Sequence, residues 1–267
     1  MRETELLTEA INERTRDLDL RSPLEQARLM NEEDRRVPAA VEAVLPQIAD
    51  AVVRIAQALR RGGRLIYVGA GSSGRLAVLD AAECPPTFGT PPDLVQAVLA
   101  GDAQAVTEAV EGAEDDEAAG ERAMEARGVR PDDVVVGIAA SGRTPFVVAA
   151  VRRARARGAT TIAVACNPAS PLEAACELSI VPLVGPEVIA GSTRLGAGTA
   201  QKLVLNMLST LAMVQLGKVY GNLMVDLTAT NVKLRRRAVR IVAAAAEVRA
   251  YVRRPAVRAR LAGLLRE

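Results

Sequence analysis

Histidine and tryptophan are both absent from this chain of 267 residues. Without histidine there can be no Ser-His-Asp triad, no histidine-ligated zinc or haem, and no imidazole general base. Acid–base chemistry must therefore fall to aspartate, glutamate, lysine or tyrosine. Two phenylalanines and three tyrosines are too few for a surface that stacks bases, and the net charge is only +2. These shortages exclude nucleic acid as the main partner.

Cysteine is also scarce, since the chain has only Cys84, Cys166 and Cys176 and no CxxC spacing. An odd number without metal-site spacing predicts neither a disulfide framework nor a zinc site, and it favours a reducing cytosol. The first residues are polar and acidic and contain no apolar signal segment. No run approaches the ~18 apolar residues of a membrane span. We therefore expect a cytoplasmic protein with no membrane partner.

The chain does contain a regular alternation of short apolar runs and helical patterns. Apolar runs at 65–68, 94–99, 134–138, 160–165 and 178–182 predict buried parallel strands. Helices are expected from Ser22-Pro23, over 37–60, in 103–127 with a break, from Pro145 to 157, and over 197–217 and 226–252. This alternation predicts an α/β fold in which a five-stranded parallel sheet lies between helices, with helical extensions at both ends.

Two of the predicted strands end in loops rich in glycine and hydroxyl groups, at 69–75 and 141–144. Ligands of open α/β sheets bind at the carboxyl ends of strands. At such a place glycines admit an anion, and hydroxyls and helix N-termini donate hydrogen bonds to it. Two such loops at one sheet edge favour a monophosphate ester such as a sugar phosphate.

Nucleotide binding and simple turns are the alternatives for these loops. Gly69, Gly71 and Gly74 have dinucleotide-type spacing, but no acidic residue follows the second strand until Asp102. Neither loop contains the Gly-Lys-Ser/Thr of a P-loop. Both loops could also be tight strand-to-helix turns without a ligand.

Two groups of carboxylates are candidates for acid–base work. Glu83 precedes Pro85-Pro86, which we expect to end its helix. The helix dipole disfavours a charged carboxylate at that end, which suits a general acid. Glu114 belongs to the acidic cluster 111–116. The structural alternatives are a surface carboxylate for Glu83 and a solvated helix start for Glu114. A metal site in the cluster lacks a supporting pair of aspartates at a strand end.

The loop after the fifth strand adds further candidate substrate-binding residues. These are Glu187, Ser192, Thr193 and Arg194. They precede the helix over 197–217, so the loop could bring them to the same sheet edge. Its alternative role is to cap that helix.

Several of these segments occur together in a known family. ECPPTFG at 83–89, EGAEDD at 111–116 and GPEVIAGSTRLGAGTAQK at 185–202 closely resemble the bacterial N-acetylmuramic acid 6-phosphate etherases, and the similarity covers about residues 5 to 240. The resemblance implies a sugar isomerase (SIS) domain over 55–218, between helical segments at 1–54 and 219–267. It also implies a homodimer with sites near the interface, a small sugar phosphate as the ligand, and no cofactor or metal.

The resemblance further implies a lyase that converts N-acetylmuramic acid 6-phosphate and water into N-acetylglucosamine 6-phosphate and D-lactate, during recycling of cell-wall sugars. By match to the family motifs, Glu83 is the proton donor and Glu114 the other acid/base residue. The residues implied in phosphate binding are Ser72, Ser73, Ser141, Gly142 and Thr144.

The chain departs from the family pattern in two places. Gly196 stands where the family usually has a lysine, and the part after about Ala243 is shorter and richer in arginine than the usual helical tail. Two other functions remain open at this point. A non-catalytic sugar-phosphate-binding regulator would need the phosphate loops but not both glutamates. An aldose–ketose isomerase would use similar chemistry on another substrate.

Overall fold

A computed structural model describes residues 6–226, 236, 238, 240 and 241. Its centre is one parallel sheet with strand order β2-β1-β3-β4-β5. The strands are β1 (Leu65–Gly69), β2 (Val95–Leu99), β3 (Val134–Ile138), β4 (Thr160–Val164) and β5 (Leu178–Ile180). The prediction of a five-stranded parallel sheet is confirmed.

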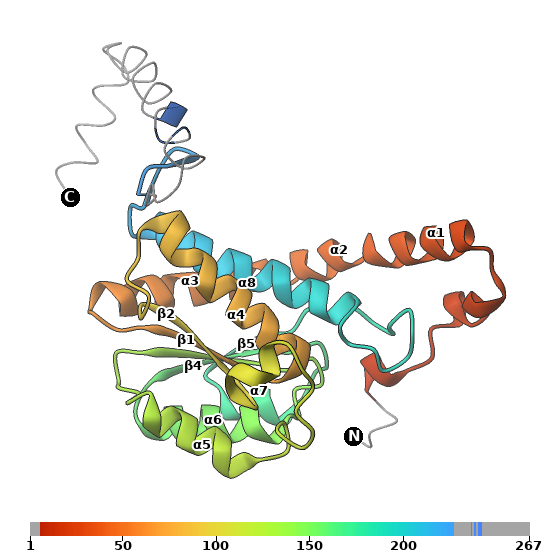
Figure 1. Ribbon diagram of the computed structural model, residues 1–267, viewed down its shortest axis with the longest axis horizontal. Helices are drawn as coiled ribbons and strands as arrows, with labels where there is room; N and C mark the ends of the chain where they lie inside the picture. Colours follow the sequence, from red (N-terminus) through yellow and green to blue (C-terminus); the bar gives the residue numbers. More distant parts are fainter. Residues whose placement is uncertain (1–5, 227–235, 237, 239, 242–267) are drawn as a thin grey trace.

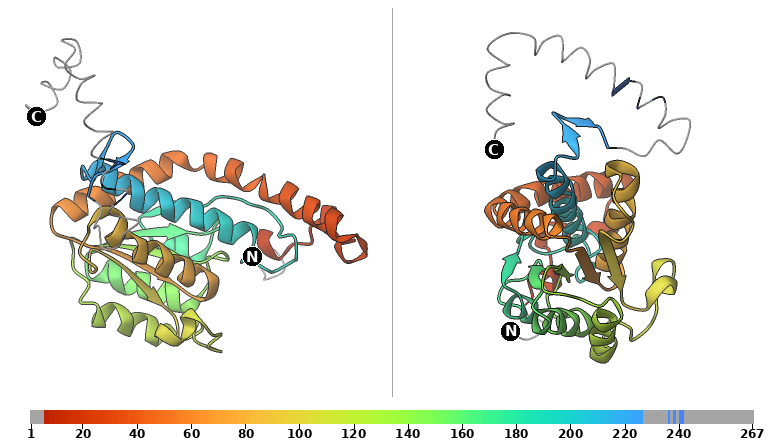
Figure 2. Two further views of the ribbon diagram at one scale, coloured as in Figure 1. Left: turned by 45° about the horizontal axis from the view of Figure 1, so that its top comes forward. Right: turned by 90° about the vertical axis from the view of Figure 1, so that its left-hand side faces the viewer.

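Helices cover both faces of this sheet (Figure 1). The helices are α1 (Pro23–Asp34), α2 (Val37–Glu42), α3 (Leu45–Arg60), α4 (Gly71–Phe88), α5 (Glu117–Ala126), α6 (Pro145–Ala156), α7 (Pro171–Ala175) and α8 (Gly196–Gln215). Helices α3, α4 and α8 pack on one face, and α5, α6 and α7 on the other. Helix α1 has no buried residue and projects past the sheet (Figure 2). Within the described residues, no helix combines the length and apolar character of a membrane span.

Short elements complete the described chain. The 3-10 helices are η2 (Leu7–Glu9), η3 (Glu13–Thr15), η4 (Leu18–Leu20) and η5 (Asp102–Val106). After α8, the strands β6 (Val219–Tyr220) and β7 (Leu223–Met224) pair antiparallel.

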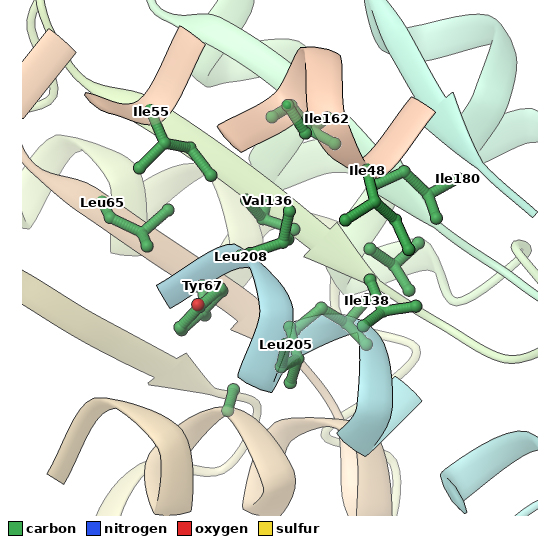
Figure 3. Packing of buried hydrophobic residues seen from close by; sticks show 14 of the residues in the cluster. Ile48, Ile55, Leu65, Tyr67, Val136, Ile138, Ile162, Ile180, Leu205 and Leu208 are labelled. Carbon is green, nitrogen blue, oxygen red and sulfur yellow. The ribbon is translucent and has the colours of Figure 1, made fainter. Parts of the chain in front are cut away.

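The two-residue period of the strands divides the core into two layers. In β1, Leu65 and Tyr67 face the layer of α3 and α8, whereas Ile66 and Val68 face the layer of α6. Figure 3 shows the first layer, in which isoleucines of α3 and leucines of α8 meet alternate residues of the strands. Each such fully buried side chain contributes roughly 1.5–3 kcal/mol to folding. The sheet is therefore held on both faces, and its carboxyl edge is a rigid base for the loops.

The expected start of α1 is confirmed. Ser22 and Glu25 form a capping box, in which the backbone N–H of Ser22 donates to Oε2 of Glu25 at 2.9 Å, and Pro23 is the first helical residue.

Two helix predictions are wrong, and both concern proline. The helix expected over 37–60 is two helices, because Pro46 lacks an N–H and its ring opposes a helical turn before it, so α3 restarts at Leu45. Pro85 and Pro86 do not end α4, which continues to Phe88. The buried Phe88 ties the last turn to the core, and Gly89 ends the helix in a left-handed conformation.

The helix expected in 103–127 is also shorter than the pattern indicates. After η5 the chain turns until Asp116, whose side chain caps α5 by accepting the N–H of Ala119 at 2.8 Å. The helix expected over 226–252 and the segment after Ala243 lie, apart from a few positions, outside the described residues.

Candidate functional site

At the centre of the loop after β3, the backbone is left-handed and leaves no room for a side chain. Gly142 has φ +67°, and an added Cβ would lie 2.3 Å from Oγ of Ser170. The N–H of Arg143 donates to Oγ of Ser141 at 3.2 Å, and Thr144 precedes the first residue of α6. The loop therefore presents two hydroxyl residues at the N-terminus of a 12-residue helix, an arrangement that suits an anion.

Glu114 is held beside this loop. Its backbone carbonyl accepts the N–H of Phe146, in the first turn of α6, at 3.0 Å. A cavity of about 870 Å³ opens here, lined by Leu6, Glu9, Ala10, Ile11, Glu114, Asp115, Ser141, Arg143, Thr144 and Pro145. The structure thus brings Glu114 together with Ser141 and Thr144 around one cavity, which we call the β3 cavity.

The loop after β1 presents its two serines differently. Ser72 lines a second cavity, of about 390 Å³, together with Arg194 and Lys202. Ser73 is buried, and its hydroxyl donates to Oε1 of Gln201 at 2.9 Å. A smaller cavity of about 190 Å³ lies between the other two, since it shares Glu114 with the β3 cavity and Arg75 with the second.

Glu83 lies apart from these cavities. It is exposed on α4 and lines none of them. Its spacing from Ser72, Leu76 and Leu79 places all four residues on one stripe of the helix. Glu83 follows Ser72 by 11 residues, which is roughly 16 Å along a helix. Within one chain, none of these three cavities is therefore lined by both Glu83 and Glu114.

Glu187 caps the N-terminus of α8. It is 2% exposed, and its two oxygens accept the N–H groups of Gly196 at 2.7 Å and Ala197 at 2.9 Å. Burial raises the pKa of Glu187, and the two N–H groups oppose that rise in pKa. Both carboxylate oxygens are thus used within the fold.

The rest of this loop leads toward the second cavity. Ser192 and Thr193 form the turn before α8, where the N–H of Ser192 donates to the carbonyl of Ile189 and the N–H of Gly198 to that of Thr193, both at 2.9 Å. Arg194 lines the second cavity. Within the residues that the structure describes, no group of three or more Asp, Glu, Cys or His side chains is arranged to hold a metal ion.

Sequence reasoning missed one wall of the β3 cavity, formed by residues 6–11. We call this segment the N-terminal wall. Its first helix, η2, spans only Leu7–Glu9, which is too short for any periodic pattern. In the sequence, Glu9 is the one signal that could have indicated this wall, because it is an acidic residue without a predicted role in a segment that resembles the family.

The fold and the phosphate-type loops define a sugar isomerase domain. A model of the SIS domain matches residues 110–212, and one of the glucokinase regulatory protein N-terminal SIS domain matches residues 47–155. The solved phosphoheptose isomerase from Neisseria gonorrhoeae has a TM-score of 0.55 at 21% identity, over 73% of this chain and all (100%) of its own. The one from Francisella tularensis has a TM-score of 0.52 at 16% identity, over 72% and 98%. These two likenesses concern the fold alone.

Closer relatives identify the family within that class. A protein named N-acetylmuramic acid 6-phosphate etherase from Symbiobacterium thermophilum is 60% identical over 237 residues, which cover 89% of this chain and 79% of the relative. Another with that name, from Serratia proteamaculans, is 59% identical and covers 89% and 80%. The chain belongs to the N-acetylmuramic acid 6-phosphate etherase family.

Proposed function

We propose that this chain is a carbon–oxygen lyase that cleaves the D-lactyl ether of N-acetylmuramic acid 6-phosphate. With one water consumed, the products are N-acetylglucosamine 6-phosphate and D-lactate. The observation that carries the proposal is the β3 cavity, where Glu114 lies beside a hydroxyl loop at the N-terminus of α6. Membership of the etherase family supports the same substrate.

The chemistry needs a phosphate anchor, a base and an acid. An ether at C3 of a sugar resists direct displacement, but ring opening exposes an aldehyde at C1 and makes the C2 proton acidic. Glu114 removes that proton, and the electron pair forms the C2–C3 double bond as the lactyl oxygen leaves C3 with a proton from Glu83. Water then adds at C3 and C2 is reprotonated. Positioned acid–base groups contribute roughly 10²–10⁴-fold each to such steps.

The phosphate anchor is the loop after β3. The hydroxyls of Ser141 and Thr144 donate to the phosphate, the positive end of the α6 dipole favours its charge, and Gly142 allows its close approach. Ser72 completes the phosphate-binding set at the start of α4, and Ser73, whose hydroxyl donates to Gln201, stabilises that turn. Ser192, Thr193 and Arg194 bind more distant groups of the substrate. The same anchor fixes the sugar relative to Glu114, which supplies the orientation that the proton transfer needs.

Two copies of the chain share each site in this proposal. Glu83 lies on an exposed stripe of α4 with Leu79, which is 51% exposed. Leu79 also lines the second cavity together with Lys202 of the neighbouring helix α8. A second copy that packs on this stripe would therefore lie beside that cavity. A two-fold dimer through this face brings Glu83 of one copy to the cavities of the other.

The proposal places the protein in the cytoplasm, with an SIS domain over 55–218 and helical segments at 1–54 and 219–267. The free cysteines Cys84 and Cys166, both buried, support a reducing compartment. Helix α3 crosses the first boundary, so the N-terminal segment continues into the body of the fold.

The test is D-lactate release from N-acetylmuramic acid 6-phosphate by the purified protein. Glu83→Gln and Glu114→Gln are expected to abolish release while both variants keep binding the sugar phosphate. Only Glu114→Gln should stop exchange of the C2 proton with deuterated water. Exchange at the parental rate in that variant would refute the role of Glu114 as the base.

A mixed dimer tests the shared site. Glu83→Gln and Glu114→Gln chains carrying different tags are co-expressed and purified as the mixed species. If the two glutamates of a site come from different chains, one of the two sites is intact and about half of the parental activity returns. If both come from one chain, the mixed dimer is inactive.

A further inference from the structure

The N-terminal wall is fixed to the ligand edge of the sheet by buried polar contacts. The N–H of Leu7 donates to Oδ1 of Asn167 at 2.7 Å, and Nδ2 of Asn167 donates to Oγ1 of Thr8 at 3.0 Å. The same amide donates to the carbonyl of Ala140 at 2.9 Å. Thr8 and Asn167 are both 0% exposed. Buried polar groups are costly unless paired, so this complete pairing holds the wall in one position.

A second set of contacts ties the wall to the loop after β5. The N–H of Gly191 donates to the carbonyl of Thr8 at 3.2 Å. Further along, Oγ1 of Thr15 donates to the carbonyl of Val188 at 2.8 Å. The wall is therefore bonded directly to the loops after β4 and β5, and through Asn167 to the loop after β3. All three loops lie at the carboxyl edge.

These attachments leave Glu9 facing the cavity. Glu9, Ala10 and Ile11 line the β3 cavity together with Glu114 and Ser141. The carboxylate of Glu9 lies over Gly191, where an added Cβ would come within 2.8 Å of Oε2. Glu9 is exposed, and its carboxylate has no hydrogen-bond or ion-pair partner among the described residues. The backbone beside Glu9 is thus held in place, and its carboxylate presents free lone pairs to the cavity.

We propose that Glu9 is a substrate-binding residue whose carboxylate accepts hydrogen bonds from neutral hydroxyls of the sugar. This inference rests on the proposed function. A carboxylate repels the phosphate and lactyl carboxylate of the substrate, so its partner is the part of the sugar that carries only hydroxyl groups. Hydrogen bonds to a charged acceptor of this kind change affinity by roughly 10- to 100-fold.

The test compares Glu9→Ala and Glu9→Gln with Glu13→Gln. Glu13 is in the adjoining η3, is fully exposed and pairs only with Arg16 at the surface, so it is a matched control outside the cavity. The measurements are KM and kcat for D-lactate release and the inhibition constants of N-acetylglucosamine 6-phosphate and inorganic phosphate. We expect Glu9→Ala to raise KM and to weaken inhibition by N-acetylglucosamine 6-phosphate by roughly 10- to 100-fold. Inhibition by inorganic phosphate, and every constant of Glu13→Gln, should stay parental.

Two results would overturn the role of Glu9. One is a parental affinity of Glu9→Ala for N-acetylglucosamine 6-phosphate. The other is an equal loss of affinity for inorganic phosphate, which would show that the loop after β3 had been disturbed. If the parent protein releases no D-lactate but binds N-acetylglucosamine 6-phosphate in calorimetry, the proposed function fails and the comparison of Glu9→Ala with the parent still decides this inference. If the parent protein neither releases D-lactate nor binds N-acetylglucosamine 6-phosphate, the proposed function and the role of Glu9 both fail.

Discussion

Replacing Glu187 by alanine should destabilise the protein without touching the cavities. The change removes the only acceptors of the N–H groups of Gly196 and Ala197 in the described structure, with Glu187 itself 2% exposed. A buried donor left unpaired costs roughly 1–3 kcal/mol. This change leaves the buried N–H of Ala197 and the half-buried N–H of Gly196 without their acceptors. Because burial also penalises the charged carboxylate, part of this cost is offset. The expected loss in the free energy of unfolding is about 2–4 kcal/mol.

The pH dependence distinguishes Glu187→Gln from the parent protein. Burial raises the pKa of Glu187 in the folded state above its ordinary value of 4.5, so the folded state holds this proton to higher pH than the unfolded state. The stabilising effect of that proton is complete below the unfolded-state pKa and is lost as pH rises through the folded-state pKa. Glutamine does not titrate. Because the Nε2 of glutamine cannot accept a hydrogen bond, the Gln variant should be less stable than the parent at about pH 4 and should regain part of that difference toward pH 7.

Urea unfolding followed by circular dichroism at both pH values measures these differences. If the free energy of unfolding of the Ala variant lies within about 0.5 kcal/mol of the parent value, the capping role is refuted. A difference in stability between the parent and the Gln variant that is the same at both pH values would also count against it. Gly196→Lys is a further check, since a Cβ at Gly196 lies 3.1 Å from Oε2 of Glu187. An ammonium group beside that carboxylate lowers its pKa and should reduce the loss of stability with rising pH.

Three further substitutions or reactions test other parts of the fold. Asp133 is 0% exposed and accepts a hydrogen bond from Nη2 of Arg64 at 2.6 Å. Asp133→Ala should therefore lower the free energy of unfolding by about 3 kcal/mol and leave KM unchanged in the lactate assay. A free energy of unfolding near the parental value would contradict this. Burial raises the pKa of the Cys166 thiol to about 12, so iodoacetamide at neutral pH should label it only at the rate of unfolding, and rapid labelling of native protein would be the contrary result. Gly142→Ala, which adds a Cβ 2.3 Å from Oγ of Ser170, should weaken inhibition by inorganic phosphate at least about tenfold, and parental inhibition would remove this loop from phosphate binding.

The sheet could be predicted from the sequence because its strands are buried on both faces. Such strands are continuous apolar runs, like Val134–Ile138 in β3, and turn residues bound each of them. The start of α1 and the glycine-rich ends of β1 and β3 could be predicted for a similar reason, since local chemistry at Ser22 and at Gly142 decides the backbone there. These features depend on residues close together in the sequence.

Helix ends were less predictable where tertiary packing outweighs local preference. Pro46 does break its helix, but Pro85 and Pro86 are accommodated in α4 because Phe88 is anchored in the core. The N-terminal wall could not be predicted at all. Its position depends on contacts between Thr8 and Asn167, which lie 159 residues apart in the chain.

The length of α4 between Ser72 and Glu83 has the largest consequence for the site. This stretch of helix carries Glu83 roughly 16 Å from Ser72, on an exposed stripe that it shares with Leu79. This position of Glu83 fits the shared site that we propose, in which a second chain supplies one of the two glutamates. For this reason the mixed dimer of Glu83→Gln and Glu114→Gln chains tests the geometry and the mechanism together: returned activity supports the shared site, and an inactive mixed dimer would mean that one of the two glutamates has been given the wrong role or the wrong chain.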